Sequence, residues 1–142
     1  MKVNLKKFKE NVLYLLKEKN FSVQKICEQA NLGKNMIYDL DLHLPSLENA
    51  IKISKALDIS LDYLVGRTEN QDKLKSISAK NFYKNLNIIL KENKIIKTKF
   101  YKDMNYSTDC FTRWKKGSIP YLSTIIEIAD YLNCSIDDLL EE

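Results

Sequence analysis

The sequence predicts an all-α protein, and three observations support this prediction. The 142 residues include only three glycines and two prolines, too few for the many turns of a sheet-based fold. Apolar residues recur at the three- and four-residue spacing of amphipathic helices. The chain also repeats itself, which favours two copies of one small helical domain over a single larger one.

The internal repeat is found by shifting the sequence by 74 residues. Phe8 then falls on Phe82, and Asn31 falls on Asn105. After one inserted residue the offset is 75, and Pro45-Ser46-Leu47 falls on Pro120-Tyr121-Leu122. Two copies of a unit of roughly 60 residues therefore fill nearly the whole chain, and each is close to the lower size limit for independent folding.

We predict two tandem five-helix domains joined by a short linker. The first domain is placed at residues 1–66 and the second at residues 80–142. The intervening residues 67–79 are polar and hold only two large apolar residues, which is typical of a linker.

In the first copy, the apolar stripe of the first helix includes Phe8, Val12 and Leu16. Ser22 is a suitable N-cap for a second helix that runs to about Ala30. Apolar residues predict three more helices. The third helix carries Met36, Ile37 and Leu40, and the fourth begins after Pro45 and carries Leu47, Ala50, Ile51 and Leu57. The fifth is a short helix capped by Ser60.

The second copy predicts the same order of helices. Their markers are, in turn, Phe82, Leu86, Ile89 and Leu90; Lys97 to Met104; Phe111 and Trp114; Leu122, Ile125, Ile126, Ala129 and Leu132 after Pro120; and a last helix capped by Ser135. Ser135 and Asp138 have the spacing of a capping box, with Asp in place of Glu. The last helix, with Ile136, Leu139 and Leu140, either supplies a dimer surface or closes the core.

The second and third helices of the second copy have the pattern of a helix-turn-helix. Asn105-Tyr106-Ser107 is long enough only for a tight turn, and the helix after such a turn can enter the major groove of DNA. Phe111 and Trp114 lie three residues apart, so both face inward. Thr108, Asp109, Thr112 and Arg113 then lie on the outer face. Arginine can pair with guanine through two hydrogen bonds, and aspartate can accept one from cytosine.

The distribution of charge supports an interaction with phosphate. Residues 82–116 hold nine Lys or Arg against three Asp or Glu, whereas residues 117–142 hold six acidic residues and no Lys or Arg. One face of this copy should therefore be cationic. The predicted DNA-binding residues of the second copy are Lys97, Lys99, Ser107, Thr108, Asp109, Thr112, Arg113, Lys115, Lys116 and Ser118.

Both copies resemble the lambda-repressor-like (Cro/C1-type, XRE) helix-turn-helix family of transcriptional regulators, and the second copy resembles it more closely. The resemblance rests on Ile95 to Phe100, on Asn105-Tyr106-Ser107, on Phe111 to Pro120, and on Ile128 to Leu140. It implies a five-helix fold, sequence-specific binding to duplex DNA and frequent dimers on palindromic sites. It also implies that the residue at Lys97 touches phosphate, and that those at Thr108, Asp109 and Arg113 touch bases.

The first copy fits this pattern less well. Val23 stands where the family usually has a polar phosphate contact, and Asp39 stands where the second copy has Arg113. Residues 8–44 hold five basic and five acidic residues. The candidate DNA contacts here are Lys34, Asn35 and Tyr38, of which Asn35 could read adenine. This copy either reads a half-site weakly or contacts a protein partner.

The sequence therefore predicts a repressor-like regulator of transcription that binds double-stranded DNA, with a homodimer or a protein partner of the first domain as further possibilities. The alternative is a protein-interaction module of a mobile element that keeps the helix-turn-helix fold but inhibits or bridges a protein. The sequence shows no nucleotide-binding, metal-binding or nucleophile motif, so we expect no enzyme activity, no cofactor and no metal.

The expected location is the cytoplasm. The cysteines, Cys27, Cys110 and Cys134, are odd in number and not at metal-ligand spacing, so we interpret them as reduced thiols. No apolar run approaches the ~20 residues that a membrane-spanning helix needs. We therefore expect no membrane partner.

Overall fold

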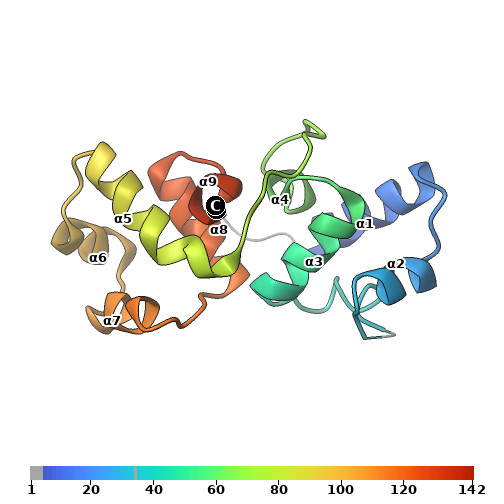
Figure 1. Ribbon diagram of the computed structural model, residues 1–142, viewed down its shortest axis with the longest axis horizontal. Helices are drawn as coiled ribbons and strands as arrows, with labels where there is room; N and C mark the ends of the chain where they lie inside the picture. The colour runs from blue at the N-terminus through green and yellow to red at the C-terminus, as the bar shows by residue number, and fades with distance from the viewer. Residues whose placement is uncertain (1–4, 34) are drawn as a thin grey trace. The chain divides into compact units, whose positions relative to one another are not determined.

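The structure, a computed structural model, describes residues 5–33 and 35–142, without the side chain of Leu5 (Figure 1). Contacts within the chain divide it into two compact units: unit 1 ends at Lys75 and unit 2 begins at Ser76. In the described ranges the assigned elements are helical, apart from an isolated bridge between Ile77 and Glu141. None of the helices described is long and apolar enough to cross a membrane.

The described residues of unit 1 form four α-helices. They are α1 (Leu5–Glu18), α2 (Val23–Gln29), α3 (Leu47–Leu57) and α4 (Leu61–Leu64). A serine side chain caps each of the last three by accepting a hydrogen bond from a backbone N–H three residues further on. Ser22 accepts from Lys25, Ser46 from Asn49 and Ser60 from Tyr63. The predicted caps at Ser22 and Ser60 are therefore confirmed, and they fix where α2 and α4 begin.

The predicted third helix of the first copy is wrong, because residues 35–43 form a series of turns. The carbonyl oxygen of Tyr38, which a continuing helix would pair with the amide of Leu42, accepts a hydrogen bond from Lys9 Nζ at 2.8 Å. Lys9 also pairs with Asp41 at 3.2 Å. Both contacts tie this series of turns to α1. Ile37 and Leu40 are buried as expected, whereas Met36 is half-buried.

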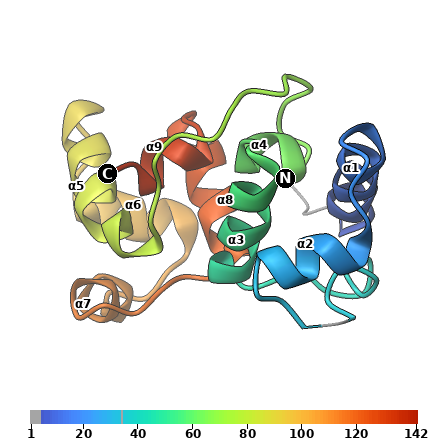
Figure 2. The same cartoon turned by 45° about the vertical axis from the view of Figure 1, so that its right-hand side comes forward.

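Unit 2 contains a short 3-10 helix at Ala79–Asn81 and five α-helices. These are α5 (Phe82–Glu92), α6 (Lys97–Met104), α7 (Asp109–Lys115), α8 (Leu122–Leu132) and α9 (Ile136–Leu140). The loop that leaves α7 and leads into α8 can be followed in Figure 2. The capping box between Ser135 and Asp138 is present, so the predicted start of α9 is confirmed.

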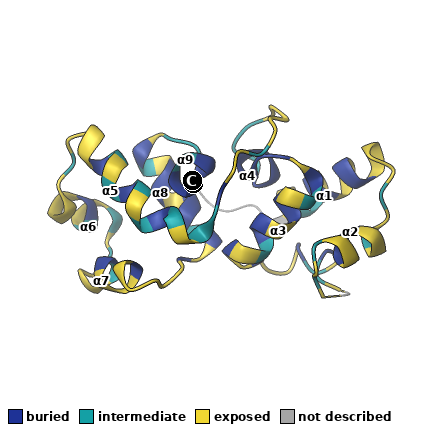
Figure 3. Cartoon of the chain, viewed as in Figure 1, coloured by how far each residue is buried: buried dark blue, intermediate teal, exposed yellow. Residues whose placement is uncertain are grey.

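Each unit has its own apolar core, and the buried residues are coloured dark blue in Figure 3. In unit 1, the fully buried core residues include Phe8 and Val12 of α1, Leu57 of α3 and Leu61 of α4. Asn11 donates a hydrogen bond of 2.8 Å to the carbonyl oxygen of Tyr63, which ties α1 to α4. In unit 2 the apolar residues of α9, which are Ile136, Leu139 and Leu140, are fully buried. This helix therefore closes the core of unit 2.

The predicted linker at 67–79 is held at both ends. On the unit 1 side, the carbonyl oxygen of Asp72 accepts a hydrogen bond of 2.9 Å from the amide of Ser60. On the unit 2 side, Ile77 is fully buried, and the amide of Ser78 donates to Leu140 at 2.9 Å. The segment that joins the two anchored ends is therefore much shorter than the predicted linker.

Candidate nucleic-acid interface

A tight turn joins α6 to α7. Asn105 ends α6 in the left-handed conformation, with φ 57° and ψ 40°, which asparagine tolerates better than most residues. The amide of Tyr106 then donates to the carbonyl oxygen of Tyr101 at 2.9 Å, and that of Cys110 donates to Ser107 at 3.2 Å. These bonds close the end of α6 and begin α7. The geometry is that of a helix-turn-helix.

Two aromatic side chains hold α7 against unit 2. Phe111 and Trp114 are buried, as the sequence predicted. The ring of Phe111 packs edge-on against Phe100 and Tyr101, with centroids 5.6 and 5.0 Å apart, and the ring of Trp114 packs against Phe82 at 5.0 Å. Such edge-to-face pairs favour one orientation of the helix. α7 is therefore anchored to both α5 and α6.

The opposite side of α7 and its flanking segments face solvent (Figure 3). The predicted contacts exposed there are Ser107, Thr108, Asp109, Thr112, Arg113, Lys115, Lys116 and Ser118. Since Phe111 and Trp114 occupy the inner side, the exposed side carries hydroxyl, carboxylate, guanidinium and ammonium groups. We call these eight exposed residues the α7 surface.

Arg113 also lines a cavity at the C-terminal end of α7. This cavity, of about 360 Å³, is bounded by Tyr106, Cys110, Trp114 and the loop from Ser118 to Tyr121, together with Thr124. The Arg113 guanidinium donates a hydrogen bond to Cys110 Sγ at 3.5 Å. Sulfur is a weak acceptor, so most of the hydrogen-bonding capacity of this guanidinium remains available to a ligand.

The two predicted phosphate contacts on α6 differ in their surroundings. The Lys97 ammonium lies 5.1 Å from the ring centroid of Phe111 and 5.9 Å from that of Tyr83, so the charge sits beside α7. Lys99 is instead paired with Asp103 at 2.8 Å, one turn along the same helix. A phosphate group would have to compete with this carboxylate for Lys99.

Two tyrosine–carboxylate pairs connect the helix-turn-helix to α8. Tyr131 donates to Asp103 at 2.5 Å, and Tyr106 donates to Glu127 at 2.8 Å. The hydrogen bonds from Lys99 and Tyr131 lower the pKa of the Asp103 carboxyl, because both favour the ionised form. Burial raises the pKa of the Tyr106 phenol, and its bond to Glu127 raises that pKa further. Both phenols therefore remain neutral donors near pH 7.

The corresponding part of unit 1 presents a different surface. Asn35 is exposed and Tyr38 is 55% exposed, but both lie in the turns at residues 35–43 rather than on a helix. Lys34 lies outside the described residues. Val23, at the start of α2, is half-buried. Unit 1 therefore has no continuous helical counterpart of the α7 surface among its described residues.

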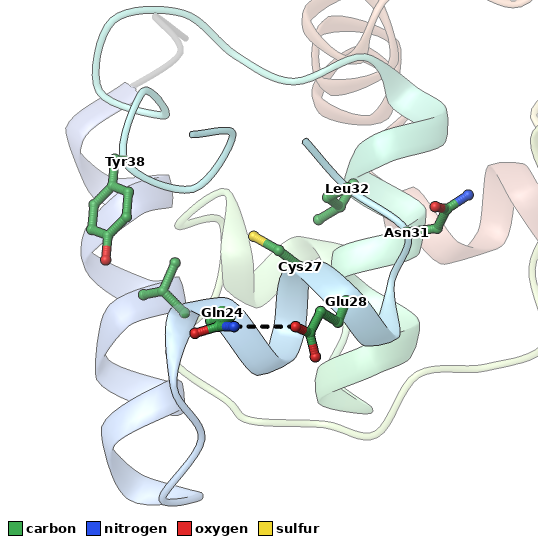
Figure 4. Close-up of a pocket in the computed structure, with 7 residues that line it drawn as sticks. Gln24, Cys27, Glu28, Asn31, Leu32 and Tyr38 are labelled. Carbon is green, nitrogen blue, oxygen red and sulfur yellow. Dashed lines mark hydrogen bonds between the residues drawn. The ribbon is translucent and has the colours of Figure 1, made fainter. Parts of the chain in front are cut away.

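A cavity of about 590 Å³ lies beside α2 in unit 1 (Figure 4). Its lining residues are Val23, Gln24, Cys27, Glu28, Asn31, Leu32 and Tyr38. Gln24 donates to Glu28 at 3.2 Å along one wall. Burial raises the pKa of the Cys27 thiol, so this group is a neutral, weakly polar part of the wall. The cavity combines apolar and polar side chains beside a segment that is not helical.

Sequence reasoning missed the groups that brace the site. The pair of Lys99 and Asp103 has the i, i+4 spacing that often indicates an ion pair on a helix, so it could have been found. The contact between Cys110 and Arg113 likewise joins residues three apart. The tyrosine–carboxylate pairs join residues 21 and 28 positions apart, and nothing in the local sequence indicates them.

Comparison with known families bears on unit 2. Residues 85–141 match the Cro/C1-type HTH DNA-binding domain, over a range that includes α6 to α9 and most of α5. The match covers less than half of the chain and does not include unit 1. No curated protein and no solved structure matches the chain significantly. The helix-turn-helix geometry and this match agree: residues 85–141 form a Cro/C1-type helix-turn-helix DNA-binding domain.

Proposed function

We propose that the chain is a sequence-specific, repressor-like regulator of transcription that acts in the cytoplasm, and that α7 enters the major groove of double-stranded DNA. Thr108, Asp109, Thr112 and Arg113 would contact base edges. Arg113 would pair with guanine, and Asp109 would accept from the amino group of cytosine.

One observation carries this proposal: the division of α7 into a buried aromatic side and an exposed polar side. A recognition helix must be held rigidly by its own domain and must also offer polar side chains to the groove. Phe111 and Trp114 meet the first requirement because they are buried against α5 and α6. The α7 surface fits the second requirement, because its polar side chains are exposed.

Exposed cations next to α7 support binding to the phosphate backbone. Lys97, Lys115 and Lys116 would each meet a phosphate, and Ser107 and Ser118 would donate hydrogen bonds to the backbone on either side. Lys99 would contribute only by exchanging Asp103 for phosphate. Each lysine that neutralises a phosphate releases condensed counterions, so affinity should fall steeply as salt increases.

The direct test is selection of bound sites from random duplexes, followed by affinity measurements across salt concentrations. We expect one enriched motif, and a salt slope that falls by about 0.9 for each lysine removed from the interface. Lys115→Gln and Lys116→Gln should each reduce the slope. Lys84→Gln is the matched control, because Lys84 is exposed on α5 in a groove lined by Glu92, Asp138, Glu141 and Glu142. Absence of any enriched motif would refute the proposal.

Unit 1 supports a second function, contact with a protein. Unit 1 differs from the α7 surface in three ways. It has turns at residues 35–43 in place of a helix, equal numbers of basic and acidic residues over 8–44, and a cavity beside Tyr38. Leu42 is also 69% exposed in these turns. If unit 1 binds a protein, Leu42→Ser should leave DNA affinity unchanged and abolish co-purification of that partner. If unit 1 reads a half-site, Asn35→Ala should change the selected motif.

A further inference from the structure

The residue before α8 differs in kind from its counterpart in unit 1. Ser46 and Tyr121 correspond in the internal repeat, where Pro45-Ser46-Leu47 falls on Pro120-Tyr121-Leu122. Both are N-caps of eleven-residue helices, and both have extended backbones. Ser46 Oγ accepts a hydrogen bond from the amide of Asn49 at 3.1 Å, whereas the side chain of Tyr121 makes no capping bond.

Tyrosine in place of serine at the N-cap makes α8 less stable. A serine N-cap satisfies one of the backbone N–H groups at the start of a helix, and a residue that cannot cap leaves this group to water. The Tyr121 side chain gains little from packing in return, because it is 79% exposed. A residue that breaks a local rule without a compensating contact in the folded chain is expected to serve function.

A second exchange of the same kind occurs at the start of α6. Ile96 falls on Ser22 at the offset of 74 residues, and Ser22 caps α2. The side chain of Ile96 makes no capping bond and is 68% exposed. Both exchanges are in unit 2, and they flank the helix-turn-helix. The pattern therefore points to the exposed surface around α7 rather than to the core.

The surroundings of Tyr121 indicate an anionic partner. Tyr121 lines the same cavity as Arg113 and Ser118. Between Asp109 and Glu127 the chain has no acidic residue, but it has Arg113, Lys115 and Lys116, all exposed. The phenol thus stands at the edge of a cationic surface. An amphipathic ring with a hydroxyl at its tip suits a partner that alternates apolar sugars with charged phosphates.

We infer that Tyr121 is a further DNA contact, which packs its ring on a deoxyribose and donates its hydroxyl to a phosphate beside the base read by Arg113. This inference rests on the proposed function and extends it by one residue. Because sugar and phosphate are the same at every base pair, Tyr121 contributes affinity without sequence preference. Tyrosine is not a cationic side chain, so this contact adds nothing to the salt slope, which reflects the phosphates neutralised by Lys and Arg.

The test is Tyr121→Ser in the full chain, which places at α8 the residue that caps α3. The new hydroxyl can accept from the amide of Thr124, so the melting temperature of unit 2 should rise by about 4–8 °C. Affinity for the selected duplex should fall about five- to tenfold. Affinity for duplexes with one base pair changed should fall by the same factor. Trp114, the single tryptophan, reports the melting of unit 2 by its fluorescence.

Two further variants complete the experiment. Tyr121→Phe keeps the ring and should recover part of the lost affinity. Ile88→Ser removes an apolar side chain that is 46% exposed, in the groove lined by Glu92 and Glu141, and should leave DNA affinity unchanged.

The outcomes separate this inference from the proposed function. If the wild-type chain selects a duplex and Tyr121→Ser binds it equally well, Tyr121 makes no contact and only the inference fails. A change in base preference in this variant would also overturn it, as would equal losses of affinity in Tyr121→Ser and Ile88→Ser. If the wild-type chain selects no duplex, the proposed function and the inference fail together.

Discussion

The guanidinium of Arg113 donates to the thiol sulfur of Cys110 at 3.5 Å, on the exposed side of α7. Cys110 Sγ in turn lies 3.8 Å from Ser107 Oγ. The three side chains thus follow one edge of the α7 surface. Sulfur is a weak hydrogen-bond acceptor, so this contact restrains the Arg113 side chain only weakly.

Arg113→Ala should weaken specific DNA binding by about 1–3 kcal/mol and relax base choice at one position, because it would remove the two hydrogen bonds that we propose between Arg113 and one base. Fluorescence anisotropy on the selected duplex and on its single-base variants measures both effects. Cys110→Ala is the control, since it removes only the weak acceptor and should change affinity far less. An unchanged footprint and affinity in Arg113→Ala would contradict the assignment of α7.

Asp103→Asn should make the stability of the folded chain less sensitive to acid. The pKa of this carboxyl is lower in the folded protein than its ordinary value, so the ionised form stabilises the fold above that ordinary value. This stability is lost as the pH falls below that ordinary value and through the lower folded pKa. The melting temperature of the wild type should therefore fall more steeply in this range than that of the variant.

Glu92→Gln provides the comparison for this pH series. Glu92 is exposed on α5, and this substitution removes one acidic charge, as Asp103→Asn does. Its melting temperature should follow the wild-type curve. A curve for Asp103→Asn that also follows the wild type would show that the contacts with Lys99 and Tyr131 do not stabilise the fold.

Ile77→Ala should destabilise unit 2 by about 2–5 kcal/mol, the usual cost of removing a buried aliphatic side chain. Ile77 is fully buried and pairs with Glu141 next to the end of the chain. Urea unfolding of the full chain, followed by Trp114 fluorescence, measures the change. Leu74→Ala is the control, because Leu74 is only partly buried. Equal losses of stability in the two variants would show that Ile77 contributes no more to the core of unit 2 than a linker residue does.

Gly66→Ala should destabilise unit 1 by about 1–2 kcal/mol, because an L-residue is strained in the left-handed region. Gly66 has φ 84°, and an added Cβ would lie 2.8 Å from Lys7 Cγ. The lysine stem can move, but the backbone strain remains. Gly33→Ala is the matched control, because nothing lies within 4 Å of its Cβ position. Thermal unfolding followed by circular dichroism should show a lower transition only for Gly66→Ala.

The helices predicted correctly are those whose signals are local. Ser22, Ser60 and Ser135 each cap a helix through a backbone amide three residues away, so a short stretch of sequence contains both partners. The inward direction of Phe111 and Trp114 also follows from their spacing alone. The exposed outer side of α7 is a consequence of that direction, so its residues could be predicted together.

The features predicted wrongly, or missed, depend on contacts between distant parts of the chain. Residues 35–43 have an apolar pattern that fits a helix, yet Lys9 of α1 takes the carbonyl oxygen of Tyr38. Residues 76–78 look like linker, yet Ile77 is buried and Ser78 pairs with Leu140. In both cases the contact joins residues that are at least 29 positions apart, and helical periodicity carries no information about such contacts.

The sequence by itself determined the helical class, the order of the helices in unit 2 and the polar side of α7, since these follow from periodicity and capping within a few residues. Only the tertiary structure decided that residues 35–43 are not helical, that α9 closes a core, and that Lys99 is paired while Arg113 remains available. Those outcomes depend on which side chains compete for the same hydrogen bond or the same buried volume, and that competition exists only once the helices are packed.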